Sequence, residues 1–436
     1  MDYIEARKYI DDIMAGKGSI PGLSSIKNLL DLMDNPQNKV SVIHVAGTNG
    51  KGSAVAFISQ VLVQAGYKTG VYMSPSVFEY RERMKINNRF ISENEYADEI
   101  SYICRCVNKM KENGQDIPTA FEMETAAAFD YFVKQGCDIA VIETGFGGKE
   151  DATNVCDNPL VSVIMSVSMD HMNFLGDTLE EIAMAKAGII KRNTDAVLYR
   201  QSEKVMDIVK DTAQENNCIL RITGSVTDVE YGCGLTEFTY QSKDNIYRNI
   251  KIRLLGTFQP ENAAAAIEAC EIIRQKGFDI TDESIYQGLY NAVHHGRFEK
   301  IGDKPLFFMD GAHNAGALKC LKDTMDTYFC DMHLIFIMGV LADKDFGNII
   351  KDIAGCADYI LTVTPYNIRA LPAGRLADSL DGVSQNIEAA ESVYDAVKKA
   401  LAIAEKYGNE DTVIMAFGSL SYLGELKSAY DGMEDY

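Results

Sequence analysis

The stretch from residue 44 to residue 57, HVAGTNGKGSAVAF, constrains the fold more than any other part of this sequence. An apolar run ends at Gly47, glycines lie on both sides of Lys51, and apolar residues at helical spacing follow from Ser53. Glycines let backbone N–H groups turn toward an anion, the lysine supplies a positive charge, and the start of the helix adds its dipole. The stretch therefore predicts a strand, a phosphate-binding loop and a helix in direct succession.

The spacing of this loop departs from the strict pattern G-x-x-x-x-G-K-[ST]. Two residues separate Gly47 from Gly50, and Gly52 separates Lys51 from Ser53. A tight glycine turn without a ligand is the plainer explanation, but it does not account for a lysine and a hydroxyl at the same strand–helix junction. We therefore expect ATP, accompanied by Mg²⁺, at a loop formed by Gly47, Thr48, Asn49, Gly50, Lys51, Gly52 and Ser53.

Apolar strand-like and helix-like segments alternate along most of the chain. Before residue 225 the predicted strands lie at 38–47, 68–74, 137–145 and 160–167, and the predicted helices lie at 53–66, 93–113, 121–136 and 178–190. Such alternation is typical of a mainly parallel sheet with helices on both faces. At the start of the last of these helices, Thr178 and Glu181 match a capping box.

The pattern changes near residue 225. Residues 237–256 alternate around a polar centre and predict a β-hairpin, and helices follow at 260–276 and 281–292. From residue 305, strands alternate again with helices, one of which starts at Ala315 and another of which covers 389–407. We therefore expect an α/β protein with a P-loop-containing, mainly parallel sheet domain at 1–295, a smaller Rossmann-like domain at 296–436, and the ligand cleft between them.

Charge and composition exclude several classes of partner. The 436-residue chain carries 42 basic and 63 acidic side chains, a formal net charge of −21, which repels nucleic acids and anionic membranes. No apolar run approaches the roughly 20 residues of a membrane span, and the N-terminus has no apolar signal core. The ten cysteines include no C-x-x-C pair, which favours reduced thiols over zinc sites or disulfides. We expect a cytoplasmic protein with small-molecule partners. The sequence leaves the oligomeric state open, and a monomer is one of the alternatives.

Polar residues at strand ends form a second candidate site. Ser74 ends one predicted strand, Glu143 lies at the end of another, and His171 follows a third. Because the carboxyl ends of parallel strands share one edge of a sheet, these side chains can meet beside the glycine loop. A carboxylate at the end of an apolar strand is costly unless something binds it. We therefore interpret the three residues as metal ligands, although a lone histidine is more often structural.

Sequence blocks along nearly the whole chain resemble those of folylpolyglutamate synthase and the bifunctional dihydrofolate synthase, members of the Mur ligase superfamily. The blocks occur in the order that the family has. They are NPQNKVSVIHVAGTNGKGS, SPSVFEYRERMKIN, FEMETAAAFDYF, ETGFGGKEDATN, SMDHMNFLGDTLEEIAMAKAGIIK, GTFQPENAAAAI, HGRFE and DGAHN.

The resemblance implies an ATP-dependent ligase. ATP phosphorylates a carboxylate of a pteroyl or folyl substrate, and the amine of L-glutamate attacks the acyl phosphate to form an amide. The acceptor would be dihydropteroate, a reduced folate or both. Lys51 and the loop N–H groups would hold the phosphates, and two Mg²⁺ ions would neutralise charge. The metal ligands would be Ser53, Ser74, Glu143 and His171.

Other residue roles follow from the resemblance alone. Lys186 matches a lysine that reacts with CO₂ and binds the second metal as a carbamate, although a solvated helix lysine is the plainer interpretation. Arg297 would reach the phosphates from the predicted hinge when the domains close. The catalytic residues would be Lys51, His171, Lys186 and Arg297, the nucleotide would also contact Asn262, Asp310 and His313, and the folate site would contain Phe121, Glu122 and Asp151.

Three residues depart from the family pattern, namely Ser76, Lys149 and Glu150. The family usually has His or Asn at the first position, and Arg followed by Leu at the other two. Lysine keeps the charge of arginine but loses its bidentate geometry, and Glu150 adds a negative charge beside Asp151. These departures leave the acceptor open. The alternatives are a Mur-type amide ligase for a non-folate carboxylate and a nucleotide-binding module without ligase activity.

Overall fold

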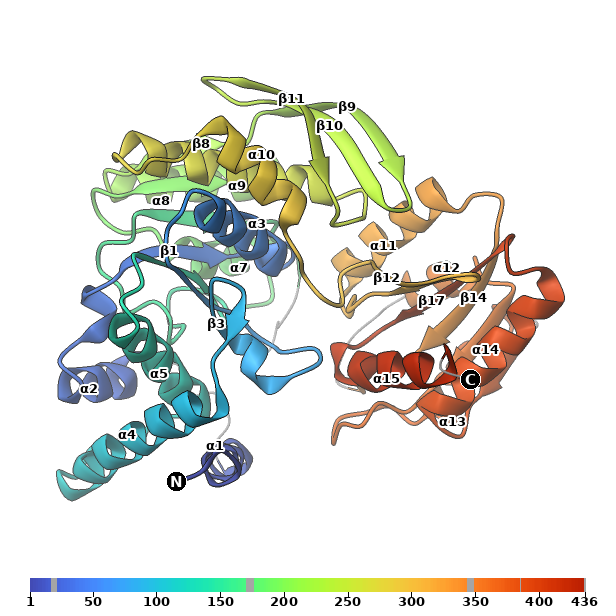
Figure 1. Cartoon of the computed structure of the whole chain (residues 1–436), viewed down its shortest axis with the longest axis horizontal. Coiled ribbons are helices and arrows are strands. Elements are labelled where there is room, and N and C mark those ends of the chain that lie inside the picture. Colours follow the sequence, from blue (N-terminus) through green and yellow to red (C-terminus); the bar gives the residue numbers. More distant parts are fainter. Residues whose placement is uncertain (17–21, 170–175, 343–348, 385, 435–436) are drawn as a thin grey trace. The chain divides into compact units, whose positions relative to one another are not determined.

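The computed structural model describes residues 1–16, 22–169, 176–342, 349–384 and 386–434 (Figure 1). The chain forms two compact units. Unit 1 comprises Met1–Asp228, Phe238–Lys251 and Pro260–Ala292, and unit 2 comprises Val229–Glu237, Ile252–Gln259 and Val293–Tyr436. The two units are therefore not contiguous in sequence. No helix among these described residues is both long and apolar enough to cross a membrane.

Unit 1 contains an 8-stranded sheet in the order β4-β3-β2-β5-β1-β6-β7-β8. The strands from β2 to β8 in this order pair in parallel, whereas β3 and β4 form an antiparallel edge. The predicted mainly parallel sheet is confirmed, and its antiparallel edge is not evident from the sequence pattern. The strands are β1 (Ser41–Ala46), β2 (Thr69–Tyr72), β3 (Met84–Ile86), β4 (Arg89–Phe90), β5 (Ile139–Glu143), β6 (Val161–Ile164), β7 (Asp195–Leu198) and β8 (Ile219–Ile222).

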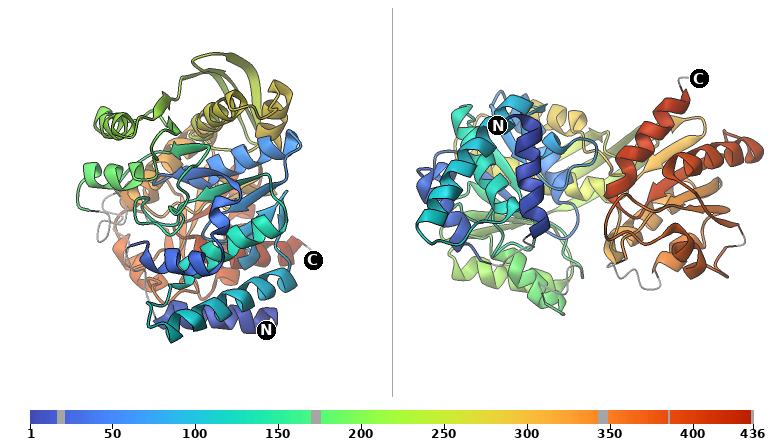
Figure 2. Two further views of the ribbon diagram at one scale, coloured as in Figure 1. Left: turned by 90° about the vertical axis from the view of Figure 1, so that its left-hand side faces the viewer. Right: turned by 90° about the horizontal axis from the view of Figure 1, so that it is seen from below.

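Helices cover both faces of this sheet. Side chains alternate between the two faces along each strand, and the central strands are buried almost throughout, so both faces need a covering layer. On one face, Val42 and Ala46 of β1 belong to apolar cores formed with α1, α2, α4, α5, α7 and α8. On the other face, α3 packs against β1, β2 and β5 and against α10 (Figures 1 and 2). These helices are α1 (Tyr3–Gly16), α2 (Ser24–Leu32), α3 (Lys51–Gln64), α4 (Glu93–Glu112), α5 (Ala120–Lys134), α7 (Leu179–Ala187), α8 (Glu203–Glu215) and α10 (Asp282–Asn291).

Glycine 288 sets the distance between α3 and α10. A Cβ at Gly288 would lie 2.4 Å from the Cα of Val61, so a larger residue would push the two helices apart. The predicted capping box at α7 is confirmed, with the Thr178 side chain accepting from the backbone N–H of Glu181. Local sequence signals therefore set where these helices begin, and small residues set how closely they pack.

The chain between residues 190 and 256 is predicted only in part. No element is predicted where β7, α8 and β8 lie. The two strands have only four residues each, but α8 was missed although Val205, Val209 and Ala213 recur at helical spacing and are buried. The predicted hairpin is confirmed as β10 (Leu235–Gln241) and β11 (Ile246–Ile252), and β9 (Ser225–Gly232) completes a 3-stranded sheet in the order β11-β10-β9. Helix α9 (Gln259–Gln275) follows.

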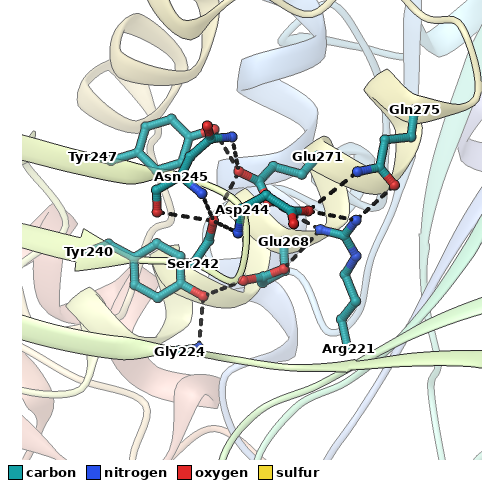
Figure 3. A network of polar contacts seen from close by, with 10 residues as sticks. All are labelled: Arg221, Gly224, Tyr240, Ser242, Asp244, Asn245, Tyr247, Glu268, Glu271 and Gln275. Atoms are coloured by element: carbon teal, nitrogen blue, oxygen red, sulfur yellow. Dashed lines mark hydrogen bonds and ion pairs between the residues drawn. The ribbon is translucent and has the colours of Figure 1, made fainter.

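A buried polar network joins this hairpin to β8 and α9 within unit 1 (Figure 3). The Arg221 guanidinium of β8 donates to Glu271 at 3.1 Å and to Glu268 at 3.4 Å. The hydroxyl of Tyr240 donates to Glu268 at 2.6 Å, and that of Tyr247 donates to Glu271 at 2.9 Å. Only 1% and 4% of the two glutamate side chains are exposed. Because both carboxylates are bonded, the network can hold the hairpin to α9 without leaving a buried charge unpaired.

Unit 2 contains a 6-stranded sheet in the order β12-β13-β17-β14-β15-β16, in which β12 is antiparallel to β13 and the other pairs are parallel. The smaller Rossmann-like α/β fold is confirmed. The strands are β12 (Glu299–Asp303), β13 (Leu306–Met309), β14 (His333–Met338), β15 (Tyr359–Thr362), β16 (Ile387–Ala389) and β17 (Thr412–Phe417). The helices are α11 (Ala315–Tyr328), α12 (Ile349–Ala354), α13 (Ala373–Ser379), α14 (Val393–Tyr407) and α15 (Leu423–Glu434).

One predicted helix boundary in unit 2 is wrong. The helix expected from residue 389 begins at Val393, because Ser392 is its N-cap and accepts from the backbone N–H of Asp395. Ala389 instead ends the short strand β16, which pairs with β15. Strand pairing thus overrides the helical spacing of the residues before the cap.

Candidate active site

The glycine loop lies between β1 and α3, as the sequence predicts. Helix α3 begins at Lys51 rather than at Ser53. The reason is that Gly50, with a φ of 84°, takes the left-handed conformation and serves as the N-cap. The lysine and the serine therefore both belong to the first turn of the helix, where backbone N–H groups lack intrahelical acceptors.

Two glycines of the loop allow close approach to other segments. A Cβ at Gly47 would lie 2.6 Å from the Cβ of Met165, which follows β6. A Cβ at Gly50 would lie 2.6 Å from Oδ1 of Asn262 in α9. The fold thus brings Asn262, a predicted nucleotide contact far along the chain, to the side of the loop.

The first half of the loop is docked on the chain after β6. The backbone N–H groups of Thr48 and Asn49 both donate to the carbonyl of Ser166, at 2.7 and 3.3 Å. The Thr48 hydroxyl donates to the carbonyl of Ser168 and accepts from its N–H, both at 3.1 Å. These contacts were not predicted, and they engage two of the N–H groups expected to face phosphate. An anion is therefore better accommodated at the first turn of α3.

Two lysines and one glutamate gather at this loop. Nζ of Lys51 donates to the carbonyls of Gly47 and Thr48, at 3.1 and 3.2 Å, and lies 3.9 Å from Oε1 of Glu143. Nζ of Lys186, in α7, donates to the same Gly47 carbonyl at 2.8 Å. Lys186 is only 4% exposed, so the interpretation of this residue as a solvated helix lysine is wrong. The combined charge of the three side chains is positive, which favours a phosphate.

The predicted metal ligands lie along one edge of the unit 1 sheet as far as the structure describes them. Glu143 ends β5, and Ser74 follows the neighbouring β2, whose Tyr72 pairs with Ile142. Ser53 is buried in the first turn of α3. These hydroxyl and carboxylate oxygens are of the type that Mg²⁺ prefers, so the residues fit the ion, whereas the two lysine amines oppose a cation that arrives without phosphate.

His171, the remaining predicted ligand, lies outside the described residues. Within the described ranges there is no group of three or more His, Cys, Asp or Glu side chains that could hold a metal ion.

On the side predicted to hold folate, Phe121 lies at the start of α5 against the loop that follows β5. A Cβ at Gly145 would lie 2.3 Å from the Cζ of Phe121, so the glycine makes room for the aromatic ring. The ring also stacks on Tyr72, with 6.0 Å between the ring centroids. Phe121 therefore forms an aromatic surface between the end of β2 and the loop that follows β5.

Glu122 has a structural task in this structure. Its Oε2 accepts from the backbone N–H and the hydroxyl of Thr119, at 2.7 and 2.8 Å, in a capping box that starts α5. This contact accounts for its burial. A role of Glu122 in folate binding stays a prediction, while its effect on the position of Phe121, its neighbour in the chain, is direct.

Asp151 holds the turn after β5. Its carboxylate accepts from the backbone N–H of Phe146 at 2.6 Å and from the N–H and hydroxyl of Thr153. Because the Thr153 hydroxyl donates to Asp151, it accepts a hydrogen bond from the Nε2–H of His44, with 2.8 Å between Nε2 and Oγ1. Burial raises the pKa of Asp151 and lowers the pKa of His44 to about 3, so the imidazole is neutral. His44 was not predicted; its only signal is a polar residue inside an apolar strand.

The same turn is packed tightly on the end of α7 that carries Lys186. A Cβ at Gly148 would lie 2.9 Å from the carbonyl oxygen and 3.0 Å from the Cα of Lys186. The Asn154 amide donates to the carbonyls of Lys149 and Gly188, at 2.9 and 3.1 Å. The departures Lys149 and Glu150 are both exposed. The turn predicted to bind folate thus packs directly on the backbone of Lys186, the α7 lysine that lies beside the glycine loop.

In unit 2, the fold brings together the predicted residues Arg297, Asp310 and His313. A Cβ at Gly311 would lie 2.3 Å from an Arg297 guanidinium nitrogen, and the imidazole of His313 donates through Nδ1 to the Gly311 carbonyl at 2.7 Å. The Asp310 carboxylate accepts from the backbone N–H groups of Phe298 and Ala312, at 2.7 and 2.6 Å. Burial raises the pKa of Asp310, and Arg297 opposes this shift. The meeting of these residues with the glycine loop in a cleft stays a prediction.

The chain is similar in sequence and in fold to known proteins along nearly its whole length. Residues 45–270 match the Mur ligase middle domain, and residues 296–420 match the Mur ligase, glutamate ligase domain. A dihydrofolate synthase/folylpolyglutamate synthase of Bacillus subtilis is 33% identical over 432 residues, covering 98% of each chain. The fold and the sequence matches thus define a ligase of the Mur type.

Two solved structures extend the similarity. Mycobacterium tuberculosis folylpolyglutamate synthase complexed with ADP has a TM-score of 0.90 at 28% identity, covering 98% of this chain and 99% of that chain. A folylpolyglutamate synthase–AMPPCP–folate complex has a TM-score of 0.84 at 29% identity, covering 99% of this chain and 100% of that chain. The chain belongs to the folylpolyglutamate synthase and dihydrofolate synthase family of Mur ligases.

Proposed function

We propose that this chain joins L-glutamate to a carboxylate of a pteroyl or folyl substrate, using ATP and an acyl phosphate intermediate. The observation that carries the proposal is the meeting of Lys51, Lys186 and Glu143 at a glycine loop that opens α3. The similar structures with ADP and with AMPPCP and folate support both ligands. Dihydropteroate, a reduced folate or both serve as the acceptor.

The reaction pushes two anions together, namely the γ-phosphate and the acceptor carboxylate. Lys51 and the N-terminus of α3 hold the transferred phosphate, because their positive charge is placed before the substrates arrive. In this proposal the nucleotide also contacts Asn262, Arg297, Asp310 and His313, as the family resemblance implies. Mg²⁺, held by Ser53, Ser74, Glu143 and His171, supplies further charge neutralisation when it is bound. The amine of glutamate then attacks the acyl phosphate carbon, and phosphate leaves.

Phe121 and the turn held by Asp151 line the acceptor side in this proposal. An aromatic ring and a rigid turn suit a flat, conjugated pteridine, since stacking adds to the burial of its faces. Glu122 contributes by starting α5 at the residue before Phe121.

The free cysteines support a cytoplasmic location, because reduced thiols are typical of that compartment.

The direct test is ADP formation by the purified chain with Mg²⁺, ATP and L-glutamate. We expect ADP to form only when dihydropteroate or a reduced folate is added together with glutamate. No ADP should form when either glutamate or the acceptor is left out. Mass spectrometry of the product should show one added glutamyl group. Turnover with a peptidoglycan precursor but with neither pterin would move the assignment to a Mur-type ligase for another carboxylate. ATP binding without turnover would leave a nucleotide-binding module.

We also propose that Lys186 is carbamylated in the active enzyme. As an ammonium, this buried group stands beside Lys51 and opposes a metal; as a carbamate it would be an anion able to bind one. Its neutral Nζ attacks the carbon of CO₂, a C–N bond forms, and one proton leaves the nitrogen. Addition of ¹³C-bicarbonate should give a carbamate carbon signal that Lys186→Met removes and Lys191→Met retains. An identical spectrum for all three proteins would contradict the proposal.

A further inference from the structure

The loop between β2 and β3 bends around a buried carboxylate. The side chain of Glu82, in the short 3-10 helix η2 (Tyr80–Arg83), accepts from the backbone N–H of Val77 at 2.9 Å, of Phe78 at 2.9 Å and of Glu79 at 2.7 Å. Glu82 is only 7% exposed. Three successive N–H groups that point to one place form a concave anion site. Here the protein fills that site with its own glutamate.

This turn starts at the edge of the sheet where the candidate active site lies. Ser74 is its first residue, and the strand before it ends at Tyr72, on which Phe121 stacks. Phe78, in the middle of the turn, is 37% exposed, while the backbone on both sides of it is bonded to Glu82. A partly exposed aromatic side chain on a fixed turn has the character of a binding surface rather than of a core residue.

The segment after the turn is tied to other elements. The Arg81 guanidinium donates to the carbonyl of Ile91 at 3.2 Å. The Arg83 guanidinium lies 3.0 Å from the fully buried Glu124 of α5, which also accepts from the hydroxyl of Tyr80 at 2.6 Å. These contacts hold η2 against α5 and against the end of β4. The position of Glu82 is therefore fixed, and its hydrogen bonds fix the turn in the same way.

We propose that Glu82 is a positioning residue that forms the Ser74–Glu79 turn before the aromatic acceptor binds. The inference rests on the proposed function, because the acceptor is the pteroyl group of that reaction. Charge-assisted hydrogen bonds to three backbone donors are stronger than neutral ones, and a turn ordered in advance lowers the entropic cost of binding. Glu82 does not touch the substrate in this proposal; it acts through Ser74 and Phe78.

The test is Glu82→Gln, which keeps the size of the side chain but removes its charge and one acceptor oxygen. Titration calorimetry with dihydropteroate should show the acceptor Kd raised about tenfold, with the Kd of AMPPCP unchanged within about twofold. Hydrogen exchange of peptides covering residues 76–80 should become faster. The matched control is Glu95→Gln, since Glu95 also accepts a backbone N–H, from Ser92 at 2.8 Å, but lies at the start of α4.

Three outcomes separate the possibilities. Unchanged dihydropteroate affinity in a folded Glu82→Gln variant would overturn the positioning role, even if the melting temperature fell as in the control. If the variant does not fold, wild-type exchange decides: amides 77–79 that exchange as fast as an unfolded peptide until dihydropteroate is added would overturn it. Failure of the wild-type chain to bind dihydropteroate or a reduced folate would instead count against the proposed function.

Discussion

Replacing Lys51 by methionine is expected to lower the rate of ADP formation about 10²- to 10³-fold at saturating ATP, acceptor and glutamate. Nζ of Lys51 is held 3.1 Å from the Gly47 carbonyl and 3.9 Å from Glu143, so its charge is in place before the nucleotide binds. Methionine has a similar length without the charge. The loss is therefore expected in the phosphoryl-transfer step, where charge accumulates between two anions, more than in the folding of the loop.

Steady-state ADP formation together with titration of AMPPCP checks this expectation. The matched control is Lys39→Met, which removes an exposed lysine paired with Asp34 just before β1. The control should keep wild-type activity within about twofold, because exposed ion pairs contribute little. A Lys51→Met enzyme within about threefold of wild type would show that the loop binds phosphate through its backbone alone.

Replacing Arg221 by methionine is expected to give the largest loss of stability, about 3–5 kcal/mol for the unfolding of unit 1. Arg221 is the cation that faces Glu268 and Glu271, and both carboxylates are almost fully buried (Figure 3). Without it, the two buried carboxylates keep hydroxyl and amide donors but have no ion pair with any other residue that the structure describes. Burial already raises the pKa of Glu268 despite the arginine, so removal of the arginine should make ionisation of this group still more costly.

Urea unfolding followed by circular dichroism measures this effect, with unit 2 expected to unfold at its own midpoint. Arg248→Met, on the exposed side of β11, is the control and should change stability by less than about 0.5 kcal/mol. Adding Glu268→Gln and Glu271→Gln to the Arg221→Met chain should recover much of the loss, since neutral amides need no counter-ion. No recovery would mean that the arginine acts through packing rather than through charge.

Much of the fold follows from local pattern. The strand, loop and helix around Lys51 are recognisable because glycine, lysine and apolar periodicity coincide within a few residues. The capping box of α7 and the hairpin at 237–256 are equally local. By contrast, β7 and β8 are too short to give a clear pattern, whereas the helical spacing of Val205, Val209 and Ala213 in α8 is present in the sequence and was missed. The predicted start of α14 is too early because the pairing of Ala389 in β16 depends on β15.

The candidate site divides in the same way. The glycine loop and the polar residues at strand ends can be read from the chain, and the order of the family blocks adds Asn262, Arg297, Asp310 and His313. The partners of these residues cannot be read in this way. Thr48 and Asn49 bond to Ser166, His44 bonds to Thr153, and the Glu82 carboxylate fills a nest of three N–H groups; each contact depends on how separate strands and turns are brought together.

Amino-acid order alone thus determines that the chain alternates strands and helices, that a glycine-rich anion loop opens α3, and which chemical groups are available to a ligase. Burial of Lys186, the approach of Asn262 to Gly50 and the packing of Gly148 on α7 are decided only in three dimensions. The physical reason is the distance along the chain over which each interaction acts. Backbone propensity and side-chain periodicity act over a few residues, whereas burial, charge pairing and close packing depend on segments that only the folded sheet brings into contact.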